Sequence, residues 1–311
     1  MNLLREQILI LISTPVYLVI IGLEMLLSNY QHRKLYTWKD TLANLYLMLL
    51  NAGLDLLFRA MYLLVLGYFY QRRIITYTNI FVYWTILLIA EDFMYYWLHR
   101  FDHEIRLFWA VHVTHHSSEK LNFTVGFRSS VFQPLYRFIY FIPLALFGFK
   151  PLDIIFIYSA TQIWGILVHT ELINKMGWLE YILVTPSHHR VHHASNPKYL
   201  DKNMGMFLIV WDMLFGTFQA ELTDKAYQPK KYGLTKNIEK KDAINIVFHE
   251  WKSIFRDISR KDTSWKEKWS YVFGPPGWSH DGSRLTSKEL RQQEADNMIH
   301  SRNLLNRKSS H

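Results

Sequence analysis

Histidines at regular spacing are the residues of this chain best suited to chemistry. Ten of the fifteen histidines lie between His99 and His193, most of them in three short motifs. The motifs are His99-Arg-Phe-Asp-His103, His112-Val-Thr-His115-His116 and His189-Arg-Val-His192-His193, the last preceded by His188. Residues three or four apart share one face of a helix. Each motif therefore presents two or three imidazoles to one point, as metal chelation requires.

A further histidine, His169, stands alone in the apolar stretch IWGILVHTELI. A single helical histidine is more often a surface or packed residue than a ligand. That explanation does not hold for three chelating clusters within 95 residues, because clustered and partly desolvated imidazoles repel one another unless a cation is bound between them. The histidines exceed the four ligands of a tetrahedral zinc site and suit two metal ions with open positions. Spacing alone does not name the metal, since imidazole binds iron, zinc, copper and nickel.

The order HxxxH, HxxHH, HxxHH after an apolar run resembles the fatty acid hydroxylase / sterol desaturase superfamily of membrane di-iron oxygenases. Within that superfamily, residues 85–235 are most similar to the alkylglycerol monooxygenase branch. The matching text includes Tyr95-Tyr96-Trp97-Leu98-His99-Arg100, His103-Glu104, Thr114-His115-His116, His169-Thr170-Glu171, Thr185-Pro186-Ser187-His188-His189 and Trp211-Asp212.

The resemblance implies that two iron ions activate O2 and that a lipid C–H bond is hydroxylated, with ether lipids as the substrates of the branch. It also brings in tetrahydrobiopterin as electron donor, with a ferredoxin-like or cytochrome donor as the alternative. The predicted metal ligands are His99, His103, His112, His115, His116, His169, His188, His189, His192 and His193. The predicted catalytic acids are Glu104, Glu171 and Asp212; for Asp212, capping or surface exposure is an equal alternative to a role behind the ligands.

One position departs from the superfamily pattern. Many members carry a further HxxxH pair before the last motif, but here Ile173 stands four residues after His169. Glu171 and Asn174 are the local alternatives as oxygen donors. On a regular helix Glu171 points away from His169, so we predict that His169 binds metal while Glu171 orients an imidazole or contacts substrate.

Other classes of membrane protein would also use clustered histidines of this kind. Within the same superfamily, the substrate could be a sterol, a carotenoid or an amino-acid-containing lipid. A histidine-rich metal transporter would place its ligands within spanning helices, whereas most lie here just beyond an apolar run or in polar sequence. A di-zinc membrane hydrolase would use the same ligands without O2, and only the identity of the metal separates it.

Long apolar runs must position these motifs. Runs at 8–28, 42–70, 79–98, 131–149 and 152–168 predict an all-α integral membrane protein with about four to five membrane-embedded helices. A helical, histidine-rich catalytic cap follows on the cytoplasmic side. Asp55 and Arg59, four residues apart in the second run, are expected to pair inside the bundle. We therefore expect transmembrane helices over 1–78, a di-iron catalytic domain over 79–218 and a basic peripheral region over 219–311.

The amino-acid composition limits the kinds of metal site and binding partner that the chain can have. The 311 residues are 50% hydrophobic and include no cysteine, which excludes thiolate metal sites and thiol nucleophiles. The net charge of +9 comes from dispersed Lys and Arg without a recognition motif, so we expect a membrane surface and no nucleic acid. A lipid substrate and a redox donor protein are the other expected partners. Residues 240–259 predict an amphipathic helix on the membrane or against the catalytic core.

Overall fold

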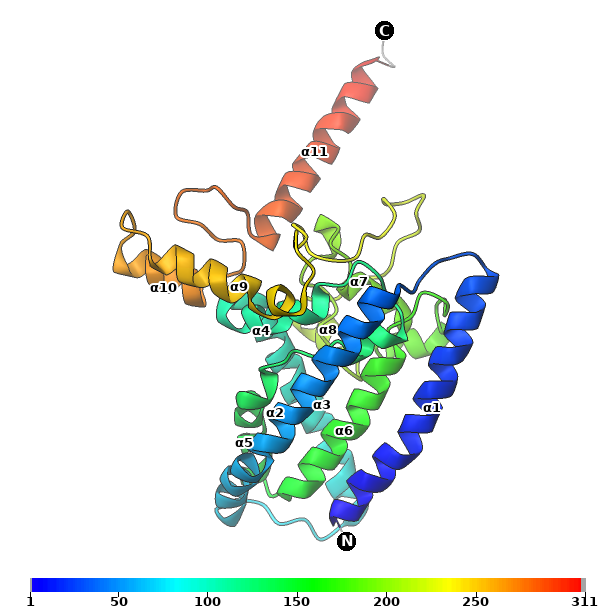
Figure 1. Cartoon of the computed structure of the whole chain (residues 1–311), viewed down its shortest axis with the longest axis vertical. Helices are drawn as coiled ribbons and strands as arrows, with labels where there is room; N and C mark the ends of the chain where they lie inside the picture. The colour runs from blue at the N-terminus through cyan, green and yellow to red at the C-terminus, as the bar shows by residue number, and fades with distance from the viewer. Residues whose placement is uncertain (1, 309–311) are drawn as a thin grey trace.

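A computed structural model describes residues 2–308, with side chains described for residues 5–300. The described chain is helical, and its β-type pairing is limited to two isolated bridges, Leu183 with Leu208 and Ala194 with Tyr232. This confirms the all-α prediction. Figure 1 shows long helices gathered in a bundle, with shorter helices and loops at one end of it.

The helices of the bundle follow the apolar runs. They are α1 (Asn2–Tyr30), α2 (Trp38–Gln71), α3 (Ile80–Glu104), α5 (Arg137–Leu146) and α6 (Pro151–Leu167). The Thr37 side chain caps α2 and the Asn79 side chain caps α3 by accepting backbone N–H groups. Pro151 occupies the first turn of α6, where no N–H is needed, so α6 begins directly after Lys150 and is separate from α5.

Two of these helices are long and apolar enough to cross a membrane, Arg5–Tyr30 and Trp38–Gln71; α6 is a shorter apolar helix. Their outer faces expose leucine and isoleucine side chains, such as Leu11 at 73% and Leu56 at 73%. The expected pair inside α2 is present, with Arg59 Nη2 2.8 Å from Asp55 Oδ2.

The main apolar core lies between α3, α5 and α6. Leu87 and Leu98 of α3 are buried there with Leu144 of α5 and Ile154 of α6, together with Leu66 of α2. This core packs against α3, and the last turns of α3 carry the first histidine motif.

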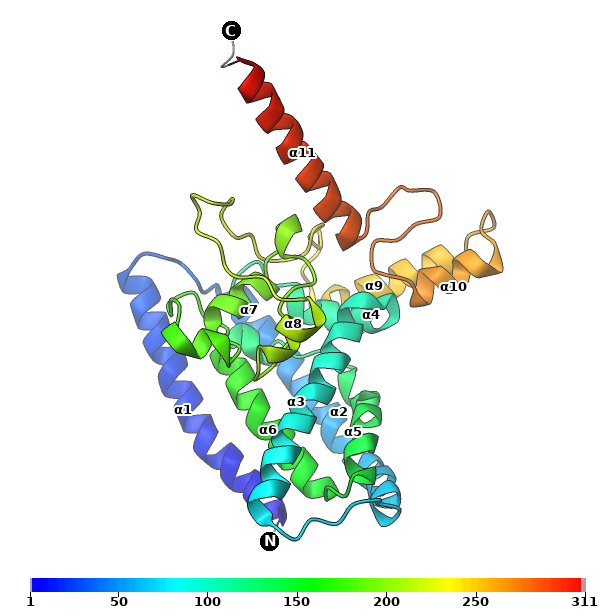
Figure 2. The ribbon, with the colours of Figure 1, turned by 180° about the vertical axis from the view of Figure 1, so that it is seen from behind.

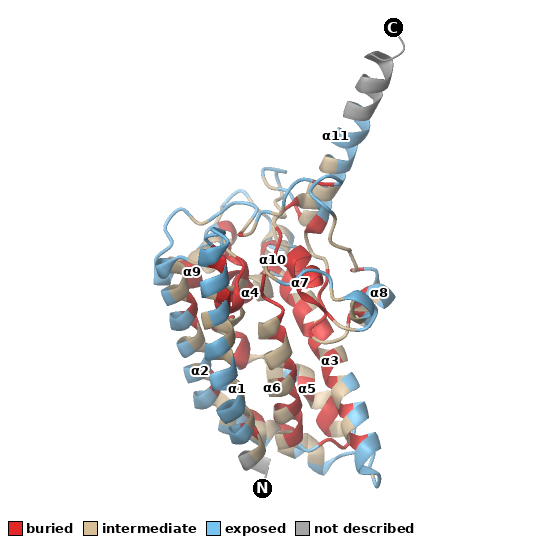
Figure 3. Ribbon diagram, turned by 90° about the vertical axis from the view of Figure 1, so that its right-hand side faces the viewer, coloured by how far each residue is buried: buried red, intermediate tan, exposed pale blue. Residues whose placement is uncertain are grey.

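The histidine-rich end is built from short helices between long loops (Figure 2). It comprises α4 (Arg106–His116), η1 (Phe123–Phe127), η2 (Gln133–Leu135), η3 (Gly177–Tyr181), α7 (Pro186–His192), η4 (Pro197–Tyr199) and α8 (Val210–Phe215). Buried residues concentrate along α3, α4 and α7, whereas α1 is mostly exposed (Figure 3).

The C-terminal region adds α9 (Ala243–Ile258), α10 (Trp265–Phe273) and α11 (Ser287–Lys308). The α9 helix matches the amphipathic segment predicted at 240–259. Figures 1 and 2 show α9 and α10 side by side at the histidine-rich end, while α11 projects away from the rest.

Candidate metal centre

Five histidines from three helices form the first histidine group: His99, His103, His112, His116 and His192. All five are buried, and one ring nitrogen from each lies within 4.8 Å of all the others. His112 is central, with its Nε2 3.1 Å from Nε2 of His99 and 3.2 Å from Nε2 of His116. Metal–imidazole bonds are about 2.0–2.1 Å long for zinc, so nitrogens this close can share one ion.

Four more histidines form the second histidine group: His115, His169, His189 and His193. Nε2 of His169 lies 2.9 Å from Nε2 of His189, 3.1 Å from that of His193 and 3.3 Å from that of His115. The solitary His169 therefore lies among histidines from two of the motifs, which is the arrangement that a role as metal ligand requires.

Two short segments contribute to both groups. In α4, His112 and His116 are four residues apart and point to the first group, whereas His115 points to the second. The segment at α7 divides similarly: His192 joins the first group, and His189 and His193 join the second. The two groups are therefore neighbours, and α4 and α7 fix their separation.

The hydrogen bonds of the outer ring nitrogen, Nδ1, indicate that the inner ring nitrogen, Nε2, presents a lone pair to a cation. Four histidines place Nδ1 within 3.0 Å of a backbone carbonyl oxygen: His99 with Met204, His115 with Arg128, His169 with Gly165 and His192 with Lys202. A carbonyl oxygen only accepts, so Nδ1 carries the proton and Nε2 keeps a lone pair in the neutral ring. Facing lone pairs repel, and Nε2 of His103 and His192 is buried with no hydrogen-bond partner among the described residues. A bound metal ion would satisfy all of these atoms.

Burial keeps the imidazoles of His115, His116 and His193 neutral. It lowers the pKa of His115 to about 4 and lowers the pKa of His116 and His193 well below the usual value, with neighbouring imidazoles adding to the effect. Neutral imidazole is the form that binds metal.

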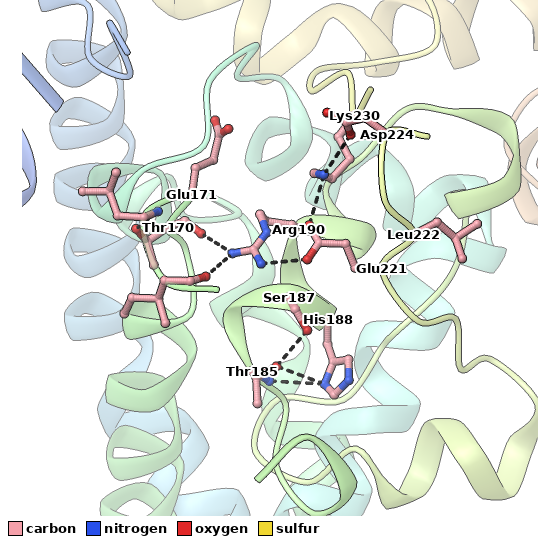
Figure 4. A network of polar contacts seen from close by, with 12 residues as sticks. Thr170, Glu171, Thr185, Ser187, His188, Arg190, Glu221, Leu222, Asp224 and Lys230 are labelled. Carbon is pink, nitrogen blue, oxygen red and sulfur yellow. Dashed lines mark hydrogen bonds and ion pairs between the residues drawn. The ribbon is translucent and has the colours of Figure 1, made fainter. Parts of the chain in front are cut away.

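His188 lies apart from both groups, unlike the other nine predicted ligands. Its Nδ1 lies 3.4 Å from the backbone N–H of Thr185, and its Nε2 lies 3.4 Å from the carboxylate of Glu180. Figure 4 shows Thr185, Ser187 and His188 together at the start of α7. The ring thus caps the helix that carries His189, and we omit it from the proposed ligands.

The three predicted acids lie in different environments, none within a histidine group. Asp212 is fully buried and accepts the backbone N–H groups of Met204 at 2.7 Å and Gly205 at 2.8 Å. Glu104 is at the surface, paired with Arg100 at 2.8 Å. Burial raises the pKa of Glu171, whose backbone carbonyl oxygen accepts a hydrogen bond from Arg33.

Sequence reasoning missed two arginines that hold the loops of the centre. The Arg190 guanidinium donates to the backbone oxygens of Thr170 at 3.0 Å and Ile173 at 2.6 Å, and it pairs with Glu221 (Figure 4). It thereby ties the segment after His169 to α7. Arg128 is buried, and its Nε donates to the Thr114 carbonyl oxygen at 2.9 Å. Arg190 lies inside the last motif, whereas no spacing signal marks Arg128.

Two cavities reach the histidines. The smaller one, about 90 Å³, is lined by His99, His112, His115, His169 and His189 and by side chains of the bundle, among them Asn51, Arg137 and Gln162. The larger one, about 920 Å³, is a vestibule lined by His103, His116, His192 and His193 and by the C-terminal region. The centre is thus reached from two separate spaces.

Comparison with known proteins agrees with this site. Residues 84–217 match the fatty acid hydroxylase family model. The resemblance found in the sequence is thereby confirmed. Alkylglycerol monooxygenase of Homo sapiens is 41% identical over 212 residues, which are 66% of this chain and 45% of that protein.

The relatives extend to other lipid-modifying enzymes. Alkylglycerol monooxygenase of Xenopus tropicalis is 37% identical over 65% of this chain and 44% of its own length. Ornithine lipid hydroxylase OlsE of Rhizobium tropici is 34% identical over 42% of this chain and 40% of its own length. The chain therefore spans less than half the length of these relatives. No solved structure matches it.

Proposed function

We propose that the chain is a membrane-bound lipid monooxygenase with a two-metal centre. The observation that carries the proposal is the pair of histidine groups, nine imidazoles whose inner nitrogens converge on two neighbouring points inside the segment that matches the fatty acid hydroxylase family model. We retain the proposed division into membrane helices over 1–78, catalytic domain over 79–218 and peripheral region over 219–311.

The nine grouped histidines would hold the two ions, which we propose to be iron, as in the superfamily that the sequence resembles. When bound, the metal pair supplies the activation of O2 and the oxidation of a C–H bond, for which no side chain suffices. One oxygen atom enters the lipid and the other leaves as water, so a donor must supply two electrons and two protons.

The chain contributes orientation and exclusion of water. Backbone carbonyl oxygens fix the tautomer and the direction of His99, His115 and His169. The small cavity beside these rings is lined by side chains of the bundle, and we propose that these side chains limit the access of water to the reacting carbon. Asp212 acts through the Met204 loop, and we propose Glu171 and Glu104 as acids that contact substrate or orient an imidazole.

We propose an ether lipid as substrate, oxidised at the carbon beside the ether oxygen. The support is the identity to alkylglycerol monooxygenases, which exceeds that to the ornithine lipid hydroxylase and to Delta(7)-sterol 5(6)-desaturase ERG3B at 28%. A sterol, carotenoid or amino-acid-containing lipid is the alternative within this class.

We propose tetrahydrobiopterin as electron donor, with a redox protein as the alternative. The vestibule supports a small molecule, because its volume of about 920 Å³ lies in the range of small-molecule sites and its wall includes four of the histidines. We further propose a multi-pass arrangement of the bundle, with the histidine-rich end in the cytoplasm beside the basic C-terminal region.

The deciding experiment uses the detergent-solubilised full chain. Metal quantification is expected to give about two iron ions per chain, since nine ligands exceed the needs of one ion. With tetrahydrobiopterin and an alkylglycerol, O2 consumption should match loss of the ether lipid. Stoichiometric zinc with O2-independent hydrolysis would identify a di-zinc hydrolase. Metal uptake into vesicles without lipid turnover would identify a transporter.

A further inference from the structure

The α9–α10 shelf, residues 243–273, carries two exposed apolar stripes. On α9, Ile244, Phe248 and Phe255 share one face of the helix, and Phe255 is 70% exposed. On α10, Trp265 and Trp269 lie four residues apart and are 87% and 65% exposed. Large side chains gathered in this way mark an interaction surface.

Arg106 fixes the direction of both stripes. From α4, its guanidinium bonds Glu250 at 2.7 Å and Asp257 at 2.6 Å on α9. The same guanidinium reaches the backbone oxygen of Tyr271 on α10 at 3.2 Å. By helical spacing, Glu250 and Asp257 lie on the face of α9 opposite its stripe, and the buried Tyr271 side chain lies on the far side of α10 from Trp265 and Trp269. Phe255 and the two tryptophans therefore face away from α4, whereas Phe248 also contacts Phe132.

The shelf adjoins a membrane-capable helix. Ile246 and Val247 of α9 pack in one cluster with Leu47 of α2. On the same stretch of α2, Leu45 and Leu49 expose apolar side chains at 47% and 60%. Figures 1 and 2 show the shelf projecting sideways from the bundle. The shelf is thus joined directly to α2, a helix that also carries exposed apolar side chains.

The charge of the shelf suits anionic lipid. Residues 243–273 contain six Lys or Arg and four Asp or Glu, and two of these acids, Glu250 and Asp257, are already paired with Arg106. Lys252, Arg256 and Lys266 are exposed beside the stripes. Tryptophan and phenylalanine on one face with Lys and Arg beside them are typical of helices that lie in a bilayer interface.

We propose that the α9–α10 shelf lies in the headgroup region of an anionic bilayer, with Phe255, Trp265 and Trp269 inserted among the lipids. The shelf is then a second membrane contact, separate from the helices that could span. It would fix the histidine-rich end at the level where a lipid leaves the bilayer. The proposal does not depend on the enzymatic activity.

The absence of cysteine makes a direct test available. The full chain is reconstituted in vesicles of phosphatidylcholine and phosphatidylglycerol, with one spin-labelled cysteine introduced as Phe255→Cys or Trp269→Cys. Collision with O2, which partitions into lipid, is compared with collision with a water-soluble nickel complex. The control is Gln293→Cys, at an exposed position on α11, the helix that projects away from the rest.

Both shelf labels are expected to collide more with O2 and less with nickel than the label at residue 293. Vesicles of phosphatidylcholine alone, or the Lys266→Glu and Lys268→Glu changes together, should raise nickel access at residue 269. Nickel access equal to that at residue 293 in anionic vesicles would overturn the proposal. Shielding from both reagents would also overturn it, because it indicates a protein partner or a second copy of this chain.

Discussion

The carboxylate of Asp212 accepts the backbone N–H of Met204 at 2.7 Å, while the carbonyl oxygen of Met204 faces Nδ1 of His99 at 2.8 Å. A single residue of backbone therefore joins a buried acid to a histidine of the first group. Asp212 also accepts the hydroxyl of Thr217 at 2.6 Å, so both of its oxygens are engaged within the loop. The acid is thus placed to orient His99 without touching it.

We expect Asp212→Asn to weaken the first histidine group. An amide in place of the carboxylate turns one acceptor into a donor that faces an N–H, so the Met204 loop must shift. Loss of such outer support typically costs about 10–100-fold in metal affinity or activity. The change is measured as the metal retained per chain after dilution and as the rate of lipid turnover. Asp224→Asn, at a side chain 66% exposed, is the matched control and should behave as the parent chain.

Each histidine group should lose its metal separately. Replacing His169 with Ala removes the residue nearest to the others of the second group, whereas His103→Ala affects the first. Each variant is expected to keep about one ion per chain, because the other group retains its ligands. Inductively coupled plasma mass spectrometry checks the count.

The control for this pair is His280→Ala, since His280 bonds Tyr271 and lies outside both groups. It should retain both ions. If His169→Ala also kept both ions and full turnover, His169 would be a packed helix residue and the second group would need another ligand.

Gly126→Ala should disturb the second group through steric contact. A Cβ at this position would lie 3.2 Å from Nδ1 of His169 and 3.0 Å from Cα of Ile166. Overpacking of this kind typically costs about 1–3 kcal/mol, so thermal unfolding should occur at lower temperature and metal content should fall. Gly53→Ala in α2 meets no atom within 4 Å and serves as the control, which should not be less stable than the parent.

Arg106→Met should release the α9–α10 shelf. The change leaves Glu250 and Asp257 without their buried partner, and breaking one side of a buried ion pair typically costs about 3–5 kcal/mol. Limited proteolysis should then cut between residues 240 and 290 far faster than in the parent. Arg260→Met removes only exposed pairs with Asp262 and Asp281, and its cleavage rate should be unchanged. Equal rates in both variants would show that other contacts hold the shelf.

Glu104→Gln tests whether Glu104, which lies outside both histidine groups, contacts substrate or donor. Its carboxylate faces Arg100 at the surface, so metal content should be unchanged. We expect lowered lipid turnover if Glu104 contacts substrate or donor as proposed. Unchanged turnover would reduce its role to the ion pair with Arg100, a contribution typically between about 0 and 1 kcal/mol.

Much of this architecture follows from local sequence patterns. Apolar runs predicted the bundle helices, and a spacing of four predicted that His112 and His116 share a face, because helix geometry depends only on neighbours along the chain. The Asp55–Arg59 pair followed from the same spacing.

Features set by tertiary packing were not predictable in this way. No local pattern shows that His192 joins α3 histidines while His193 joins His169, because that depends on how α7 docks. The turn of His188 away from both groups depends on Glu180 and Thr185. Anchors such as Arg106 and Arg128 have partners far along the chain, so their burial could not be read from their own motifs.

The sharing of α4 between both groups constrains how the protein can change over evolutionary time. An insertion or deletion of one residue between His112 and His115 would rotate His112 by about 100° relative to both His115 and His116, and so would also split the first group. Such a change could not be repaired within one group alone, since the same turn of helix serves the second. The two sites are thus inherited as one unit, and a descendant that dispensed with one ion would have to substitute residues at fixed length instead of remodelling this helix.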